Sequence, residues 1–298
     1  MRWCTFSREI TTFDLGVRIP MSTSLPNLLA THRTLVMGVV NVTADSFSDG
    51  GRYLDRDAAI EHAMRLVDEG ADILDIGGES TAPTSAGVDA EEESRRVVPI
   101  VEELAKRGAY LSVDTYKADV ARRALDAGAQ MINDVTAFRG DDDLINVVVS
   151  AGCDVCIMYA KDATPRTTRN QPVYRNVAAE IGAFLTNRAD LALRRGIAHE
   201  KIVLDPGMGA FVSGEPEPSL EILARLDEFA ALGYPVLVGA SRKGFIGQVL
   251  DTPVSDRLAG SLACASIAAW NGARIIRAHD VRETVRTVRM VDAIKRAR

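Results

Sequence analysis

The sequence has few aromatic side chains, no excess of positive charge and no long apolar run. Aromatic residues make up 5% of the 298 residues, so a buried core must consist mainly of aliphatic side chains. The formal net charge is −6, which argues against nucleic-acid binding, because proteins that bind nucleic acids usually carry a basic surface. No stretch approaches the roughly 20 apolar residues that a membrane-spanning helix needs. We therefore expect a globular protein with no nucleic-acid partner and no membrane segment.

Cysteine is also scarce, and four residues in a chain of this length do not form a disulfide framework. Cys153 and Cys156 are spaced as C-x-x-C, but they lie in an apolar run that reads as a strand, where positions three apart face opposite sides. This argues against a redox or zinc pair. The first residues carry charges where a signal peptide requires an apolar core, so we expect no export signal and a protein of the reducing cytoplasm.

From Leu35 onward, short apolar runs alternate with longer segments of helical period, which is typical of βα units and a parallel sheet. The expected strands lie at 35–40, 72–76, 109–113, 130–133, 154–158, 201–204, 235–239 and 274–277. The expected helices lie near 55–70, 89–107, 117–128, 141–151, 175–196, 218–233, 255–272 and 281–296. Five glycines are predicted to end helices in the left-handed conformation, namely Gly70, Gly128, Gly152, Gly196 and Gly272.

Eight βα units in series predict an α/β protein in which residues 34–298 form a single (β/α)8 TIM barrel. The prior of roughly 150 residues per domain would instead suggest about two domains. An open doubly wound sheet is the structural alternative. It would normally carry a G-x-G-x-x-G turn after the first strand, where this chain reads VVNVTADSF (39–47). Residues 1–33 lack a clear period and are interpreted as an N-terminal extension or leader, with Met21 as an alternative start.

Polar residues follow nearly every expected strand, at the barrel end where active sites of this fold are built. Asp and Asn at such positions also cap helices, so each of them alone has a structural explanation. Lys and Arg do not, because their charge is unfavourable at a helix N-terminus unless an anion is present. We therefore predict an anion site, formed by Ser241-Arg242-Lys243 after strand seven together with Arg277 and His279 after strand eight. The phosphate site of such barrels is commonly found at these last strands.

The other strand ends have the opposite chemistry. Asp114, Asn133 and Asp205 follow strands three, four and six, and together offer hydrogen-bond acceptors and one amide. This set suits a flat heterocycle with N–H edges, such as a pterin. A cationic side and a hydrogen-bonding side in one barrel mouth indicate a ring with a phosphorylated tail.

Several segments in this order carry a resemblance to the dihydropteroate synthase family over roughly residues 35–296. They are MGVVNVTADSFSDGG (37–51), DIGGEST (75–81), SVDTYKADVA (112–121), INDV (132–135), LDPGMG (204–209), VGASRKGFIG (238–247), RLAGSLACASIAAWNGARIIR (257–277) and HDV (279–281). The resemblance implies condensation of 6-hydroxymethyl-7,8-dihydropterin diphosphate with 4-aminobenzoate, which gives dihydropteroate and pyrophosphate in folate biosynthesis. It also implies a homodimer.

The resemblance further implies roles for single residues. Pterin contacts match Asp114, Asn133, Asp205 and Lys243, and Asp114, Asp205 and Lys243 are the expected catalytic residues. Asn41 matches the residue near Mg²⁺, the implied cofactor, and the diphosphate. Arg277 and His279 match the diphosphate anchor, with Ser241 close to both substrates. The aminobenzoate pocket is implied at Phe47, Thr81, Pro83 and Arg242.

The chain departs from the family pattern mainly around the aminobenzoate side. Ala44 stands where Pro is usual, Ala82-Pro83-Thr84 replaces Arg-Pro-Gly, Met208–Val212 replaces G-F-G-K after strand six, and Met158-Tyr159-Ala160 replaces Met-His-Met. One hypothesis is a remodelled pocket with weaker sulfonamide binding, since the DPGMG-x-F run resembles the drug-insensitive members. The alternative is neutral variation, because loops are the variable part of a fold.

Two other functions remain open at this point. Pterin-binding barrels also include methyltransferases that pass a methyl group from a methyl-pterin to a corrinoid protein. They have no diphosphate to bind, so the cationic cluster counts against them. The second alternative is a non-catalytic paralogue, because fold alone does not fix function. Pyrophosphate release in the presence of aminobenzoate distinguishes the enzyme from both.

Overall fold

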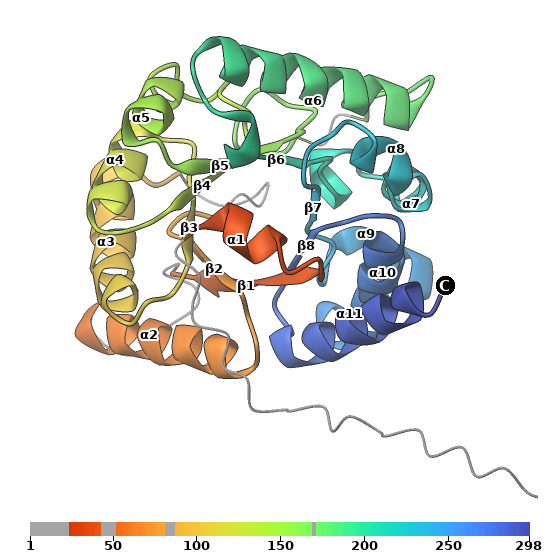
Figure 1. The fold of residues 1–298 in the computed structure, drawn as a ribbon, viewed down its shortest axis with the longest axis horizontal. Coiled ribbons are helices and arrows are strands. Elements are labelled where there is room, and N and C mark those ends of the chain that lie inside the picture. Colours follow the sequence, from red (N-terminus) through yellow and green to blue (C-terminus); the bar gives the residue numbers. More distant parts are fainter. Residues whose placement is uncertain (1–23, 43–51, 81–86, 169–170) are drawn as a thin grey trace, which may run out of the picture.

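The structure is a computed structural model that describes residues 24–42, 52–80, 87–168 and 171–298. Eight parallel strands form a ring, and helices cover its outside (Figure 1). The strands are β1 (Leu35–Asn41), β2 (Ile73–Gly77), β3 (Leu111–Asp114), β4 (Met131–Asp134), β5 (Asp154–Met158), β6 (Ile202–Asp205), β7 (Leu237–Val238) and β8 (Ile275–Ala278). The predicted single (β/α)8 barrel is thereby confirmed.

The sheet is ordered β6-β5-β4-β3-β2-β1-β8-β7, and its two edge strands meet to close the ring. A single parallel bridge joins Leu204 of β6 to Val236 next to β7, and the amide of Leu204 donates to the carbonyl of Pro235 at 2.9 Å. β7 contains two residues, so this junction has the fewest backbone hydrogen bonds in the ring. The barrel is closed, and the junction with the fewest hydrogen bonds lies beside Asp205.

The outer helices alternate with the strands as predicted, with three differences. They are α2 (Arg52–Asp68), α3 (Ala90–Lys106), α4 (Ala118–Asp126), α5 (Leu144–Ala151), α6 (Val177–Arg194), α7 (Glu217–Ala224), α8 (Leu226–Ala230), α9 (Gly244–Leu250), α10 (Leu258–Trp270) and α11 (Val281–Arg296). The predicted helix 218–233 is wrong as one element, because the helix breaks at Arg225 into α7 and α8. The short helices α1 and α9 have no counterpart in the prediction.

The predicted helix stops are confirmed at all five glycines, which have φ between +59° and +110°. Position 128 also requires glycine for steric reasons, because a Cβ there would lie 2.7 Å from the Cβ of Ala105. None of the helices in the described ranges is long and apolar enough to cross a membrane.

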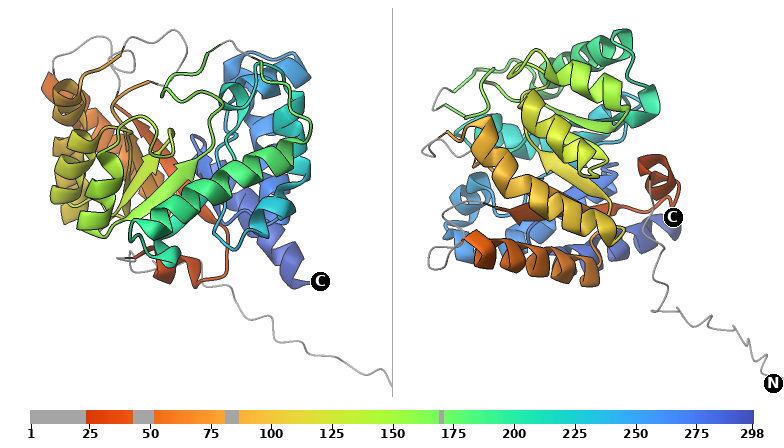
Figure 2. Two further views of the ribbon diagram at one scale, coloured as in Figure 1. Left: turned by 90° about the horizontal axis from the view of Figure 1, so that it is seen from above. Right: turned by 90° about the vertical axis from the view of Figure 1, so that its left-hand side faces the viewer.

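Helix α1 (Leu25–Leu29) closes the end of the barrel at which the strands begin (Figures 1 and 2). Leu25 and Leu28 are buried in a cluster with inward-facing strand residues such as Met37, Met131 and Cys156. The guanidinium of Arg274 donates to the carbonyl of Leu29 at 2.6 Å. The described part of the predicted extension therefore contributes two leucines to the barrel interior and leaves the opposite end of the barrel for a ligand.

Candidate active site

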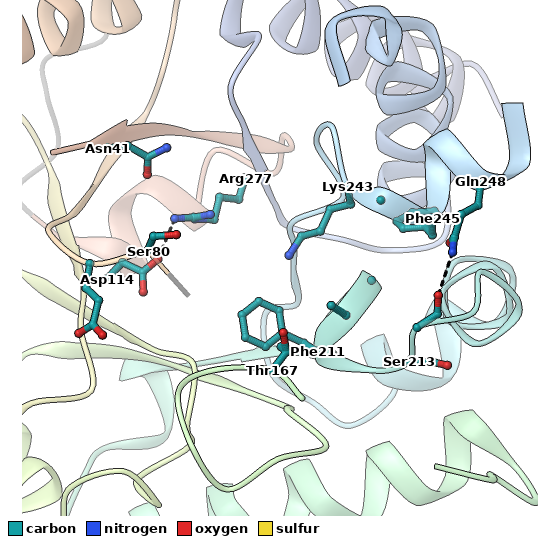
Figure 3. Close-up of a pocket in the computed structure, with 15 residues that line it drawn as sticks. Asn41, Ser80, Asp114, Thr167, Phe211, Ser213, Lys243, Phe245, Gln248 and Arg277 are labelled. Atoms are coloured by element: carbon teal, nitrogen blue, oxygen red, sulfur yellow. Dashed lines mark hydrogen bonds and ion pairs between the residues drawn. The ribbon is translucent and has the colours of Figure 1, made fainter. Parts of the chain in front are cut away.

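A cavity of about 510 Å³ lies at the end of the barrel where the strands finish (Figure 3). Its lining includes residues that follow four different strands, namely Asn41, Asp114, Lys243 and Arg277. Each of these residues was singled out from the sequence. Loops after β2 and β6 add Glu79 and Phe211. The chain therefore brings residues up to 236 positions apart in sequence to one small space, as expected for this end of a TIM barrel.

Arg277 lies at the centre of a hydrogen-bonded group beneath this cavity. Its Nε donates to Oδ2 of Asp75 at 2.6 Å, and its Nη2 donates to Oδ2 of Asp114 at 2.9 Å. The side-chain amide of Asn133 also donates to Oδ2 of Asp75, at 3.0 Å. Burial disfavours the charged form of Arg277, but the carboxyl groups of Asp75 and Asp114 outweigh this effect and raise its pKa above the ordinary value. The guanidinium therefore remains charged.

Lys243 follows β7 and projects into the same cavity, where its ammonium group lies 4.7 Å from the centre of the Phe211 ring. Burial and the neighbouring charge of Arg277 lower the pKa of Lys243 to about 8, against the opposing effect of Asp205 and Asp114. The contact with Phe211 is a cation–π interaction, which favours the charged form. Lys243 therefore loses its proton at a lower pH than an ordinary lysine, whereas Arg277 stays protonated.

The two carboxyl groups beside Lys243 also titrate near neutral pH. Burial, opposed by Arg277, raises the pKa of Asp114 to about 7. Burial raises the pKa of Asp205 to about 6, although Asp205 accepts a hydrogen bond from the amide of Gly207 at 2.7 Å. Perturbed pKa values of this kind are typical of functional sites. One buried oxygen atom on Asp75 and one on Asn133 have no partner among the described residues, and they add acceptors for a ligand with N–H groups.

Ser241, Arg242 and His279 lie on the other side of Asn41, around a second cavity of about 430 Å³. Asn41, Arg242 and His279 line this cavity, and Asn41 lines both. Oγ of Ser241 accepts from the backbone amide of His279 at 3.2 Å and lies 3.0 Å from its Nδ1. Burial and the charge of Arg277 lower the pKa of His279 to about 4, so its ring is neutral at pH 7.

Arg242 has a left-handed backbone conformation, with φ of +57°. Its amide donates to Oγ of Ser261 at 2.9 Å, its carbonyl accepts from Arg257 at 3.1 Å, and its guanidinium pairs with Asp280. Because a non-glycine residue in this region is strained, the surrounding bonds must fix this turn. The turn directs Arg242 away from the main cavity and Lys243 into it.

Three residues expected in the aminobenzoate pocket, Phe47, Thr81 and Pro83, lie outside the described residues. Conversely, the structure adds Asp75, Glu79 and Phe211 to the site. Asp75 and Glu79 lie within the DIGGEST segment, so the motif was a usable signal. Phe211 ends the DPGMG-x-F run, so the sequence marked this loop without assigning Phe211 a role.

Comparisons with known proteins agree with this geometry. Residues 37–279 match the model of a family described as "Pterin binding enzyme". Dihydropteroate synthase of Escherichia coli K12 is 44% identical over 259 residues, which cover 87% of this chain and 90% of that protein. The Bacillus subtilis dihydropteroate synthase is 40% identical over 264 residues, covering 88% and 89%.

Solved structures of dihydropteroate synthases are also similar to this chain. The Xanthomonas albilineans dihydropteroate synthase with 4-aminobenzoic acid is 42% identical and superimposes with a TM-score of 0.82, covering 88% of this chain and 93% of that one. The Yersinia pestis dihydropteroate synthase with a sulfonamide drug has a TM-score of 0.82 at 42% identity, covering 90% and 96%.

Proposed function

Since this chain belongs to the dihydropteroate synthase family of pterin-binding enzymes and is a transferase, we propose that its barrel mouth condenses 6-hydroxymethyl-7,8-dihydropterin diphosphate with 4-aminobenzoate. The products are 7,8-dihydropteroate and pyrophosphate. The observation that carries the assignment of the site is the shared cavity. Arg277 and Lys243 supply positive charge in the same space as the carboxyl group of Asp114. A pterin with a charged tail requires both kinds of group within the length of one small molecule.

The pterin would bind above Asp114, Asn133 and Asp205. The oxygen atoms of Asp75 and Asn133 that lack partners among the described residues are available to its N–H groups. Binding a desolvated carboxylate to an N–H donor favours the charged form of the acid, so the raised pKa values of Asp114 and Asp205 should fall when the pterin is in place.

The diphosphate would lie against Arg277, with His279 and Ser241 at its far end. Because the imidazole of His279 is neutral, it would donate an N–H rather than add charge. As the C–O bond to the diphosphate breaks, positive charge develops on the pterin methylene, and the nearby carboxylates of Asp114 and Asp205 would stabilise it. The aryl amine is neutral at pH 7, so positioning matters more than a strong base. This dissociative substitution needs no covalent enzyme intermediate, and a trapped pterinyl–enzyme adduct would overturn it.

Mg²⁺ is the proposed cofactor, with Asn41 as its protein ligand. No group of three or more His, Cys, Asp or Glu side chains that could hold a metal occurs within the described ranges. A single amide ligand from Asn41 fits a Mg²⁺ ion that arrives bound to the diphosphate, because Mg²⁺ commonly takes few protein ligands and several phosphate oxygens. The amide of Asn41 is exposed and lies between the two cavities. When bound, the ion would neutralise charge on the leaving group.

The decisive experiment is a coupled pyrophosphate assay with and without 4-aminobenzoate. We expect release that depends on both substrates, and loss of turnover by at least 100-fold in Lys243→Ala, in the range typical for removal of one transition-state contact. A methyl-pterin:corrinoid methyltransferase would release no pyrophosphate but would demethylate a methyl-pterin. A non-catalytic paralogue would show neither activity before or after the substitution.

We further propose weaker sulfonamide binding than in an ordinary family member. The support is the unusual sequence of the loop after β6, which places Phe211 in the cavity next to Lys243. Parallel inhibition curves against an ordinary dihydropteroate synthase test this. Equal sensitivity would mean that the loop differences are neutral variation.

A homodimer is also proposed, through the face formed by α9, α10 and α11. This face carries several exposed apolar side chains, among them Val249, Ile267, Trp270, Met290 and Ile294. Helices α10 and α11 pack against each other. Apolar patches of this kind mark protein interfaces. For the location of the protein we propose the cytoplasm, with which the free thiols of Cys153, Cys156 and Cys264 are compatible.

A further inference from the structure

The loop that follows β5, residues 159–168, crosses the barrel mouth and is anchored at two places. Near its start, the amide of Lys161 donates to the carbonyl of Phe211 at 2.8 Å. Arg139 donates to the carbonyls of Ala160 at 2.7 Å and Asp162 at 2.9 Å. Near its end, the guanidinium of Arg166 pairs with Glu79 after β2. We call this segment the β5 loop.

These anchors fix the path of the β5 loop across the site. In the sheet order, β4 and β3 lie between β5 and β2, so a loop that runs from β5 to Glu79 passes the ends of β4 and β3. Those ends carry Asn133 and Asp114. Glu79 is itself held by Lys117, which also pairs with the buried Glu93 of α3. The ion pair between Arg166 and Glu79 is therefore part of an ion-pair network that reaches helix α3.

Thr167 is the residue that the β5 loop presents to the cavity. It is 6% exposed and lines the cavity together with Asp114 and Phe211. In Figure 3 it lies beside Phe211, on the side of the cavity away from Asn41. Its Oγ1 is buried and has no hydrogen-bond partner in the part of the chain that the structure describes. A buried hydroxyl without a partner costs about 1–3 kcal/mol.

The position of Thr167 favours the pterin half of the substrate pair over the arylamine half. The β5 loop passes the pterin-side residues Asp114 and Asn133. By family resemblance, the aminobenzoate pocket forms from the first two loops and strand seven, which are other elements. Phe211 packs with Val135, Met158 and Ala160 at the ends of β4 and β5.

We propose that Thr167 is an additional binding residue for the pterin ring, whose hydroxyl hydrogen-bonds the heterocycle, and that the Arg166–Glu79 ion pair positions it. This inference rests on the proposed function, because it assumes that a pterin occupies the cavity. A hydroxyl both donates and accepts, so it complements the neighbouring carboxylates, which only accept. The role of Arg166 is to hold the β5 loop, and Arg166 itself does not touch the substrate.

The test compares Thr167→Val, which keeps the shape and removes the hydroxyl, with Thr167→Ser, which keeps the hydroxyl. We expect Thr167→Val to raise the KM for the pterin diphosphate about fivefold to tenfold, the size of one net hydrogen bond. The KM for 4-aminobenzoate and kcat should stay within twofold. Thr167→Ser should restore the wild-type KM. Arg166→Gln should raise the same KM by a smaller factor.

Thr164→Val is the matched control, because Thr164 is exposed in the same loop and its hydroxyl bonds only the carbonyl of Arg166 at 3.0 Å. Titration calorimetry with 6-hydroxymethylpterin measures binding without turnover, and thermal unfolding checks that each variant folds. Unchanged pterin affinity in Thr167→Val, or a rise confined to the KM for 4-aminobenzoate, contradicts the inference. If the wild type binds 6-hydroxymethylpterin but releases no pyrophosphate, the proposed function fails instead.

Discussion

Asp75 accepts a hydrogen bond from Nε of Arg277 at 2.6 Å, across the strand β1 that separates their own strands β2 and β8. Asp75 is fully buried and also accepts from Asn133. One carboxylate therefore fixes both the guanidinium that we propose for the diphosphate and the amide that we propose for the pterin. Removing it would leave the buried Arg277 guanidinium with Asp114 as its remaining carboxylate partner, and losing one partner of a buried charge is strongly destabilising.

We therefore predict that Asp75→Ala lowers kcat/KM for the pterin diphosphate by about 100-fold, as expected when buried charge partners are lost. Asp75→Asn should recover part of this loss, because its side-chain oxygen still accepts a hydrogen bond. Steady-state kinetics and thermal unfolding measure the two effects. Asp154→Ala, at the opposite end of the barrel, leaves the buried hydroxyl of Tyr110 without its carboxylate partner, so it should lower stability without changing the KM. Equal kinetics in the Asp75 and Asp154 variants would show that Asp75 has only a structural role.

The pH dependence of kcat/KM should be bell-shaped. Below the raised pKa values of Asp205, about 6, and Asp114, about 7, the carboxyls gain protons and lose the charge that stabilises the pterin cation. Above the lowered pKa of Lys243, about 8, the ammonium group loses its charge. The limbs report the macroscopic pKa values of the interacting groups. Lys243→Arg should remove the alkaline limb, because a guanidinium stays protonated there. A flat profile from pH 5.5 to 9 in the wild type would contradict the assignment.

Asp205→Asn should make the protein more stable at pH 8 and less active. The folded pKa of about 6 lies above the ordinary value of 3.8, so the folded protein binds this proton more tightly than the unfolded chain. The contribution of Asp205 to stability is therefore lost as pH rises from about 4 to above 6. The neutral amide avoids this loss and can still accept from Gly207, which gives a gain of about 3 kcal/mol at pH 8. Denaturant unfolding at pH 8 and pH 4 should show the gain at the higher pH alone. Lower stability at pH 8 would argue against a desolvated carboxylate.

Leu25→Ala should destabilise the barrel by about 2–5 kcal/mol, the usual cost of a cavity at a buried leucine. Leu25 is 0% exposed and packs inside the strand ring, whereas Leu220 on α7 is largely exposed. The control Leu220→Ala should change the free energy of unfolding by less than about 1 kcal/mol. Similar values for the two variants would mean that α1 does not contribute to the folded core.

Met290→Lys in the α10–α11 face should convert the proposed dimer into a monomer. Met290 is 62% exposed in the single chain, and a lysine buried in an apolar interface would be desolvated without a partner. Sedimentation should give twice the mass of one 32.2 kDa chain for the wild type and one chain mass for the variant. Val173→Asp, an exposed apolar residue on a different surface, should leave the mass unchanged. A monomeric wild type would refute the proposed dimer.

The sequence predicted the strands well, because buried parallel strands read as short apolar runs between glycine stops. β5 was predicted at its observed bounds, and β1, β2 and β4 within one residue at each end. α9 was missed because its seven residues include two glycines, and α1 because five residues show no helical period. The polar strand ends meet in one cavity as expected for Asp114, Lys243 and Arg277. Asp75 was not assigned a role, since its importance arises from two distant partners, Arg277 and Asn133, that only the closed ring brings to it.

The short helix under the barrel has an electrostatic consequence for the opposite end. Leu25 and Leu28 occlude the central axis below Cys156, so bulk solvent cannot polarise the acids and the lysine from that side. Desolvation lowers the pKa of Lys243 and raises the pKa values of Asp114 and Asp205, and we expect this apolar plug to contribute to it. Substitutions that hydrate the axis should therefore shift the activity optimum, even though they are made at the far end of the barrel from the reacting atoms.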